Sequence, residues 1–355
     1  MAEQTSTTVA GTTLIKTTTR PKTSTSRIIL AILAIIAVIG AIFLITFLAL
    51  DVFYIPYLSE FSKFLVLLLS PFLPLFFPLF LGAEMPVGLT GLVMLNLMEG
   101  FDLGALPAGS AERLHLEIEI ARLAYAVRNR HVTEEAAMRV PVDELISKSW
   151  AETLRARICR DEAMTDLGTL DLKTSDTVYM TVVDRDGNAV SLINSIFDSF
   201  GSGILCPETG VLFQNRGHSF SLDPAHPNVL APGKRAMHTI MPGMVTEGGR
   251  PALSFGVMGG DYQPMGQARV ISALFDHGMD LQAALDAPRV FTPGDAVEVE
   301  RSVPADVLRG LARKGHVLRL APDPIGGAQA IRIDHDRGVL IGASDPRKDG
   351  QACGY

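Results

Sequence analysis

The hydrophobic positions of this chain divide it near residue 86. Residues 28–50 form a run without one charged side chain. As a helix rising about 1.5 Å per residue, such a run is long enough to cross the roughly 30 Å hydrocarbon core of a bilayer. We therefore expect a transmembrane helix at 28–50. Within residues 51–85, the apolar stretch 64–81 carries three prolines, so it is either a second, kinked span or an interfacial segment.

The first 27 residues are rich in Ser and Thr and carry Lys16, Arg20, Lys22 and Arg27 against Glu3. We expect residues 1–27 to be a disordered polar tail, and the positive charge beside the first span favours a cytoplasmic N-terminus. A membrane is thus the expected location. One span would place the rest of the chain outside, and two spans would return it to the cytoplasm.

Beyond residue 86 the pattern is that of a globular α+β protein. Ser110 is placed to cap a helix whose apolar positions recur at helical spacing to about residue 129. Alternating residues on both sides of an Asp-Gly turn predict a β-hairpin at 178–184 and 189–196. We expect a layered architecture with no repeat and no parallel βαβ succession. Further helices are predicted at 142–158, 265–277, 281–287 and 304–314, and further strands at 210–214, 251–257, 297–300, 328–333 and 339–343.

Composition narrows the classes of function. The net charge is −7, so no basic stripe is available to neutralise phosphates, and nucleic acid is not an expected partner. The three cysteines, Cys159, Cys206 and Cys353, lack the spacing of a metal site and are interpreted as buried or incidental thiols. We expect no metal and no organic cofactor.

Thr177 is the first candidate for chemistry, because it stands at the start of the predicted hairpin. A threonine hydroxyl needs a base, and a free α-amino group on the same residue, with a pKa of about 7.7–8.0, can supply one. Cleavage of the bond between Asp176 and Thr177 would expose that amine. From spacing alone, a threonine that simply favours a strand is the commoner interpretation.

Several motifs, in a fixed order, resemble one protein family. The stretch 177–191 and the segments 200–203, 214–217, 232–235, 259–261 and 344–350 resemble the small subunit of the γ-glutamyltransferase family. Upstream, 94–102 and 111–115 resemble the last part of its large subunit. The resemblance extends over residues 86–355. It divides this region into 86–176, similar to the end of a large subunit, and 177–355, similar to a small, catalytic subunit.

The resemblance implies an N-terminal nucleophile hydrolase with an αββα sandwich, self-cleavage between Asp176 and Thr177, and a covalent acyl-enzyme. Thr177 then matches the nucleophile. Gly259 and Gly260 match the glycines whose backbone N–H groups hold the oxyanion. Ser195 occupies the place of a second, assisting threonine, and Asn194 is adjacent; both are otherwise ordinary polar residues of a strand.

The substrate-binding positions depart from the family pattern. Phe197 replaces an Asn, Ser219 replaces the second Asp of a pair and follows His218, and His238 with Thr239 replaces a pair of serines. Lost acceptors would leave a ligand ammonium unpaired, at a cost of about 1–3 kcal/mol each. These residues are closer to the γ-glutamyltransferase-like branch with oxamate amidohydrolase and cephalosporin acylase, which implies hydrolysis rather than transfer. Arg235 and His218 are either anchors for a substrate carboxylate or exposed surface residues.

Residues 1–85 do not resemble the remainder of a large subunit, so the resemblance supports only a partial sandwich with an uncovered apolar face. Three explanations fit the missing part of the large subunit. A separate large-subunit-like chain supplies it, the sequence is a fragment, or the chain is an inactive membrane-anchored descendant. The sequence predicts an amidohydrolase or acyltransferase that cleaves a γ-glutamyl or related small amide. The alternative is an inactive membrane-anchored protein with an association role.

Overall fold

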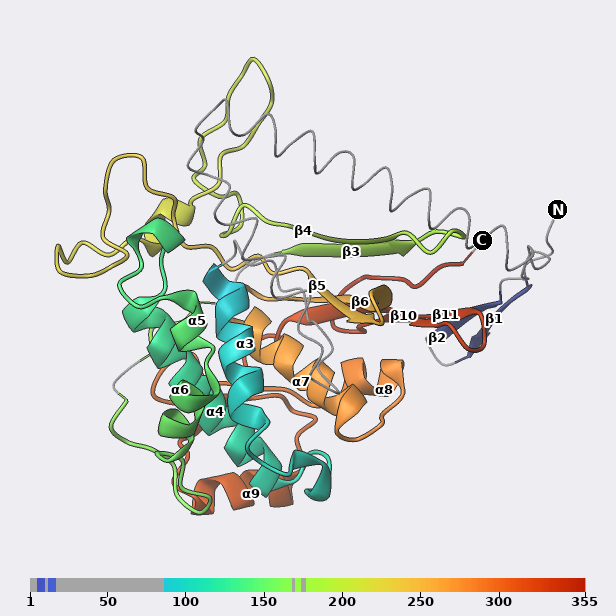
Figure 1. Ribbon diagram of the computed structural model, residues 1–355, viewed down its shortest axis with the longest axis horizontal. Coiled ribbons are helices and arrows are strands. Elements are labelled where there is room, and N and C mark those ends of the chain that lie inside the picture. The colour runs from blue at the N-terminus through green and yellow to red at the C-terminus, as the bar shows by residue number, and fades with distance from the viewer. Residues whose placement is uncertain (1–4, 10–11, 17–85, 168–169, 174–176, 355) are drawn as a thin grey trace, which may run out of the picture. The chain divides into compact units, whose positions relative to one another are not determined.

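The structure, a computed structural model, describes residues 5–9, 12–16, 86–167, 170–173 and 177–354 (Figure 1). At its centre lies a six-stranded antiparallel sheet in the order β1-β2-β11-β10-β6-β5. Its strands are β1 (Thr5–Val9), β2 (Thr12–Lys16), β5 (Gly243–Glu247), β6 (Arg250–Met258), β10 (Gly327–Asp334) and β11 (Val339–Ser344).

A β-hairpin of β3 (Val178–Val183) and β4 (Ala189–Asn194) lies over one face of this sheet (Figure 1). The Thr181 hydroxyl donates to Ser254 Oγ on β6 at 2.6 Å. At Gly256, also on β6, an added Cβ would lie 2.3 Å from Cε2 of Tyr179, so the glycine leaves room for that ring. The hairpin therefore packs directly on β6.

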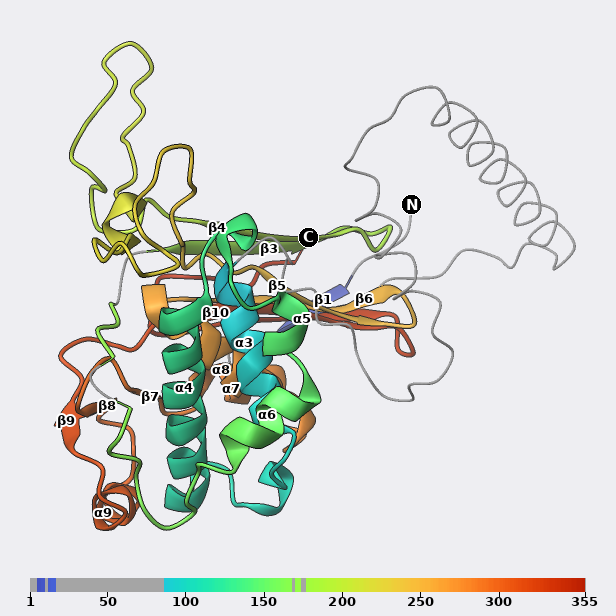
Figure 2. The ribbon, with the colours of Figure 1, turned by 60° about the vertical axis from the view of Figure 1, so that its left-hand side comes forward.

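Helices cover the opposite face of the sheet (Figure 2). These are α3 (Pro86–Met98), α4 (Ala111–His131), α7 (Gln263–Phe275) and α8 (Leu281–Asp286). Ser110 caps α4 as predicted, because its Oγ accepts from the Arg113 N–H at 3.3 Å. The main core lies between the helices and the sheet, and it includes Leu97, Ile118, Phe255, Val257 and Leu285.

A second, three-stranded sheet joins β7 (Val290–Phe291), β8 (Val297–Val299) and β9 (Leu318–Leu320). Because β8 and β9 are parallel and α9 (Ala305–Arg313) connects them, this is a small βαβ unit. The expectation of no parallel βαβ succession was therefore wrong. The unit packs against α4 at Gly310, where an added Cβ would lie 2.4 Å from the Ala111 Cβ.

Other sequence predictions are corrected by the structure. The single helix predicted at 142–158 is two, α5 (Val142–Leu145) and α6 (Lys148–Arg155), because Ser147 caps a new helix by accepting from Trp150 N–H. The strand predicted at 210–214 is absent from this described region, where only an isolated bridge joins Leu205 and Leu212. The described residues also contain short 3-10 helices: η1 (Leu103–Ala105), η2 (Glu135–Ala137), η3 (Arg216–Ser219) and η4 (Gly260–Tyr262).

The first 27 residues were expected to be disordered, but they contain β1 and β2, and β2 pairs with β11. Their Thr, Val and Ile residues favour strands, and β11 offers an edge to pair with. The transmembrane segments predicted at 28–50 and within 51–85 lie outside the described residues. Among the helices of the described part, none has the length and hydropathy needed to span a bilayer.

Candidate active site

Thr177 lies at the open end of the hairpin, immediately before β3. The last pair of the β3–β4 ladder joins Val178 to Asn194, so the register brings Thr177 next to Ser195. The Thr177 hydroxyl oxygen is buried and has no hydrogen-bond partner among the described residues. Asp176, on the other side of the predicted cleavage site, lies outside the described part of the chain.

Ser195 begins a tight turn after β4. Its hydroxyl accepts from the Phe197 N–H at 2.9 Å, and its carbonyl accepts from Arg216 Nη2 at 3.0 Å. Phe197 has a φ of +78°, which is a left-handed conformation that non-glycine residues rarely adopt. Its buried ring lies under the Arg216 guanidinium, whose carbon is 5.7 Å from the ring centre. Asn194 is exposed on the far side of the hairpin.

The glycine pair follows the end of β6 and leads into α7. Gly259 has φ +118° and Gly260 has φ +59°. A Cβ on Gly259 would lie 2.8 Å from the Gly326 Cα, so both conformation and space require glycine here. This is a strained backbone turn of the kind that lets N–H groups approach a ligand closely.

Asp261 joins this turn to the segment before Thr177. Its backbone N–H donates to the Lys173 carbonyl at 2.8 Å, and its carboxylate accepts from the Lys173 N–H at 2.7 Å. The other carboxylate oxygen forms a buried ion pair with Arg128 on α4. Asp261 therefore connects the glycine turn to the segment that leads to Thr177, through its carboxylate and through one backbone hydrogen bond.

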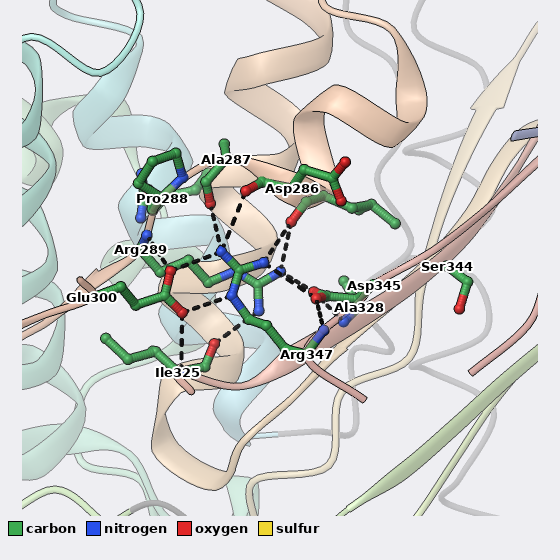
Figure 3. Close-up of polar contacts among 12 residues, drawn as sticks. Asp286, Ala287, Pro288, Arg289, Glu300, Ile325, Ala328, Ser344, Asp345 and Arg347 are labelled. Carbon is green, nitrogen blue, oxygen red and sulfur yellow. Dashed lines mark hydrogen bonds and ion pairs between the residues drawn. The ribbon is translucent and has the colours of Figure 1, made fainter. Parts of the chain in front are cut away.

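A buried ionic network lies next to Gly326, the residue that approaches Gly259, and Figure 3 shows the side chains that form the network. Arg289 forms an ion pair with Asp345 and donates to the Ile325 carbonyl at 2.8 Å, next to Gly326. Arg347 binds Glu300 through two nitrogens, at 2.6 and 2.7 Å, and Glu300 also accepts from the Ile325 N–H. Burial opposes the charge of Arg347, but the carboxylates of Glu300 and Asp345 outweigh it and raise the pKa of Arg347.

A cavity of about 490 Å³ opens beside the turn that follows β4 and contains Phe197. Ser219, Thr239 and Phe197 line it, together with Asp261. His218 also lines it, and Lys173 Nζ lies 3.1 Å from His218 Nδ1. The structure thus brings together these predicted binding residues. It does not bring Arg235 to them, because that side chain is 83% exposed and lies 3.8 Å from Glu134.

The Thr177 hydroxyl is not the only buried polar group of the site without a hydrogen-bond partner among the described residues. The others include Arg216 Nη1, His238 Nδ1 and Thr239 Oγ1. Burial, and then the nearby Arg216 charge, lower the pKa of His238. Burial also lowers the pKa of Arg216. The sequence pointed to Arg216 only as part of the 214–217 motif, although a basic residue close to the predicted Ser219 was the available signal.

One group of potential metal ligands occurs among the described residues, formed by His115, Glu119 and His316. His115 Nδ1 lies 2.8 Å from His316 Nε2, and His115 Nε2 donates to the Cys159 carbonyl at 2.8 Å. Glu119 accepts from Arg122 and from the Met164 N–H. These bonds satisfy the group without an ion, so we interpret it as a structural network, and the predicted absence of a metal stays a prediction.

The stacked sheets, the threonine at the hairpin start and the glycine turn behind it are the arrangement of an N-terminal nucleophile hydrolase. Comparison with known proteins agrees: residues 84–355 match the family described as Gamma-glutamyltranspeptidase. The chain belongs to the gamma-glutamyltranspeptidase family, as the motifs predicted.

Relatives span the branch that the sequence motifs indicated. The chain is 38% identical over 282 residues to the glutathione hydrolase-like YwrD proenzyme of Bacillus subtilis, covering 75% of this chain and 52% of the relative. It is 36% identical to the oxamate amidohydrolase proenzyme of Klebsiella pneumoniae, covering 76% and 52%. The crystal structure of cephalosporin acylase from Bacillus halodurans superposes with a TM-score of 0.68 at 40% identity, covering 75% and 49%. The chain therefore spans about half the length of the relatives it matches.

Proposed function

We propose that this chain carries the catalytic portion of an N-terminal-threonine amidohydrolase. The observation that carries the proposal is the buried Thr177 hydroxyl without a partner among the described residues, at the open end of the hairpin. A buried polar group of this kind costs free energy unless a ligand or a neighbouring group supplies its partner. The relatives that are named proenzymes support activation by cleavage.

Activation would begin with attack of Thr177 Oγ1 on the Asp176 carbonyl carbon. The peptide bond breaks as the ester forms, the Thr177 nitrogen becomes a free amine, and water then hydrolyses the ester. The same hydroxyl next attacks the substrate amide while the new amine takes its proton and passes it to the leaving amine. Backbone N–H groups of Gly259 and Gly260 stabilise the oxyanion, and a second water releases the acid.

The proposed substrate class rests on unpartnered atoms around the turn that follows β4, where Arg216 contacts Ser195 and Phe197. Arg216 Nη1, His238 Nδ1 and Thr239 Oγ1 can together bind a carboxylate. Phe197 and Ser219 supply no negative charge for an ammonium group. We therefore favour a small amide that carries a carboxylate, either a γ-glutamyl compound or a related amide, and hydrolysis over transfer.

The outer face of the hairpin supports a partner. Val178, Met180 and Val182 on β3 and Val190 and Leu192 on β4 are 45–66% exposed and lie on the same face. Exposed contiguous apolar side chains on a sheet mark an interaction surface. We propose that a separate large-subunit-like chain covers this face and completes the sandwich. Anchoring in a membrane through residues 28–50 stays a prediction.

The decisive experiment is mass spectrometry of the purified chain, alone and with a co-expressed large-subunit-like segment. We expect a new N-terminus at Thr177 in the wild type, none in Thr177→Ala, and cleavage retained in Thr177→Ser because its hydroxyl can still attack. An uncut chain in the presence of the partner would refute the hydrolase and favour the inactive, associating protein. Cleavage without amide hydrolysis would refute only the proposed substrate class.

A further inference from the structure

A second cavity, of about 170 Å³, lies among the helices on the other side of the glycine turn. Apolar residues of α4, α7 and α8 form part of its wall, among them Leu114, Val270, Ala273 and Ala284. Its volume resembles that of an engineered apolar cavity of about 150 Å³ that binds benzene. The exposed residues Ala108, Gly109 and Pro304 also line it and mark the side on which it opens.

The charged groups in the wall do not balance. Glu117 forms ion pairs with both Arg113, at 2.8 Å, and Arg269, at 2.9 Å. One carboxylate thus serves two guanidinium groups. Arg289 also lines the cavity, but Asp345 neutralises it. Asp276, outside the wall, is exposed and connects to Arg113 through the Ser272 hydroxyl. Burial opposes the charge of Arg269, but Glu117, the Tyr262 hydroxyl and Glu300 outweigh it and raise the pKa of Arg269.

Two nitrogen atoms at this wall, Arg269 Nη1 and His277 Nε2, are buried and lack hydrogen-bond partners among the described residues. Glu117 Oε2 also lacks a hydrogen bond there, and its contact is the ion pair with Arg269 Nε. The other Arg269 nitrogens are engaged, Nε with Glu117 and Nη2 with the Pro288 carbonyl at 2.9 Å. A buried N–H of a charged group without an acceptor costs about 1–3 kcal/mol or more. An anionic acceptor would remove that cost and offset the excess positive charge.

We propose that this cavity is a binding site for a small carboxylic acid with an apolar body of about the size of a benzene ring. The carboxylate accepts from Arg269 Nη1 and from His277 Nε2, and the ring or alkyl group lies against Leu114, Val270 and Ala273. Water can hydrogen-bond to Arg269 Nη1 and His277 Nε2, but it gains no free energy from contact with the apolar wall. The cavity therefore favours an amphipathic anion over water alone.

The location connects this site to the glycine turn. Tyr262 and Gly266 line the cavity. The Tyr262 ring also packs against Gly326, where an added Cβ would lie 2.6 Å from its Cδ1. The bound acid would therefore contact the side chain that supports Gly259 from the helix side, and it would not occupy the cavity beside Thr177.

The test is isothermal titration calorimetry of the full chain with benzoate, and with benzamide as a neutral probe of the same shape. We expect saturable, millimolar or tighter binding of benzoate and at least tenfold weaker binding of benzamide, because the amide forms no charge-assisted hydrogen bond. Ala273→Leu fills the cavity and abolishes binding, whereas Ala312→Leu, an exposed alanine-to-leucine change on α9, leaves it unchanged.

Arg269→Gln tests the charge separately, with Arg319→Gln at an exposed position of β9 as its matched control. We expect Arg269→Gln to weaken benzoate binding about tenfold or more while circular dichroism shows a folded chain, and Arg319→Gln to have no effect. Benzoate that fails to bind the wild type, that binds no better than benzamide, or that binds Ala273→Leu equally well would overturn the proposal.

Discussion

The two faces of the β3–β4 hairpin differ sharply. On the inner face, polar contacts and glycines fit the hairpin to β6, and behind β6 the glycine turn is held by Asp261 and by the network around Asp345. On the outer face, five large apolar side chains are 45–66% exposed. Within the described residues, a glycine turn held by several polar contacts thus lies beside a sheet face whose apolar side chains are exposed. Contacts within the chain therefore stabilise the glycine turn, whereas the outer face is where the proposed large-subunit-like chain would bind.

The largest effect is expected in the ionic network. Asp345→Asn leaves Arg289 without its carboxylate, and removing one partner of a buried pair costs about 3–5 kcal/mol. Asp345 is fully buried, whereas Asp349, in the same tail, is exposed. We expect urea unfolding to show this loss for Asp345→Asn and almost none for Asp349→Asn. Equal stabilities for both variants would show that the network does not support the turn.

The glycine turn should be the next most sensitive point. In Gly259→Ala, the new Cβ occupies a residue with positive φ and also lies too close to Gly326. Together these effects lower the free energy of unfolding by roughly 3 kcal/mol. Gly187, in the hairpin turn, has φ +85° but open space around it, so Gly187→Ala costs only about 1 kcal/mol. Denaturation of the two variants separates backbone strain from contact. A similar loss in both would show that the contact with Gly326 is unimportant.

The histidine pair of the helical layer predicts a pH dependence. Burial, followed by the neighbouring His115, lowers the pKa of His316 to about 3. Since an unfolded histidine titrates near 6.5, the unfolded state binds more protons between these values, and stability falls as pH decreases from 6.5 towards 3. The slope approaches about 1.4 kcal/mol per pH unit for one group. His316→Gln should flatten the stability profile below pH 6.5; an unchanged profile would contradict a buried, neutral His316.

The smallest effect is expected on the outer hairpin face. Leu192 is 47% exposed, so Leu192→Ser should change the stability of the chain alone by no more than about 0.5 kcal/mol. Leu253→Ala, at a position 2% exposed on β6, should cost about 2–5 kcal/mol. Leu192→Ser should nevertheless weaken association with a large-subunit-like chain in analytical ultracentrifugation. Unaltered association would place the partner on another surface.

The sequence predicted well where local signals agree with the fold. Ser110 predicted the start of α4, and the alternating residues around the Asp-Gly turn predicted the hairpin. It failed at α3, because residues 87–90 are buried in succession and show no one-sided apolar stripe. Within the candidate site, the order of motifs predicts catalytic roles for Thr177 and the glycine pair, and these roles stay predictions. It could not show that Arg216 turns its guanidinium towards Ser195, since that contact depends on the turn at Phe197.

The paired bonds between Lys173 and Asp261 have a consequence for a nicked molecule. Helices α3 and α4 precede Thr177, yet they share one apolar core with α7 and β6, which follow it. Scission after Asp176 would therefore leave two polypeptides that stay interlocked, migrating as one species on a sizing column and as two bands in detergent. The new carboxyl-terminal segment of the upstream polypeptide would remain bound to Asp261, next to the glycine turn, through Lys173.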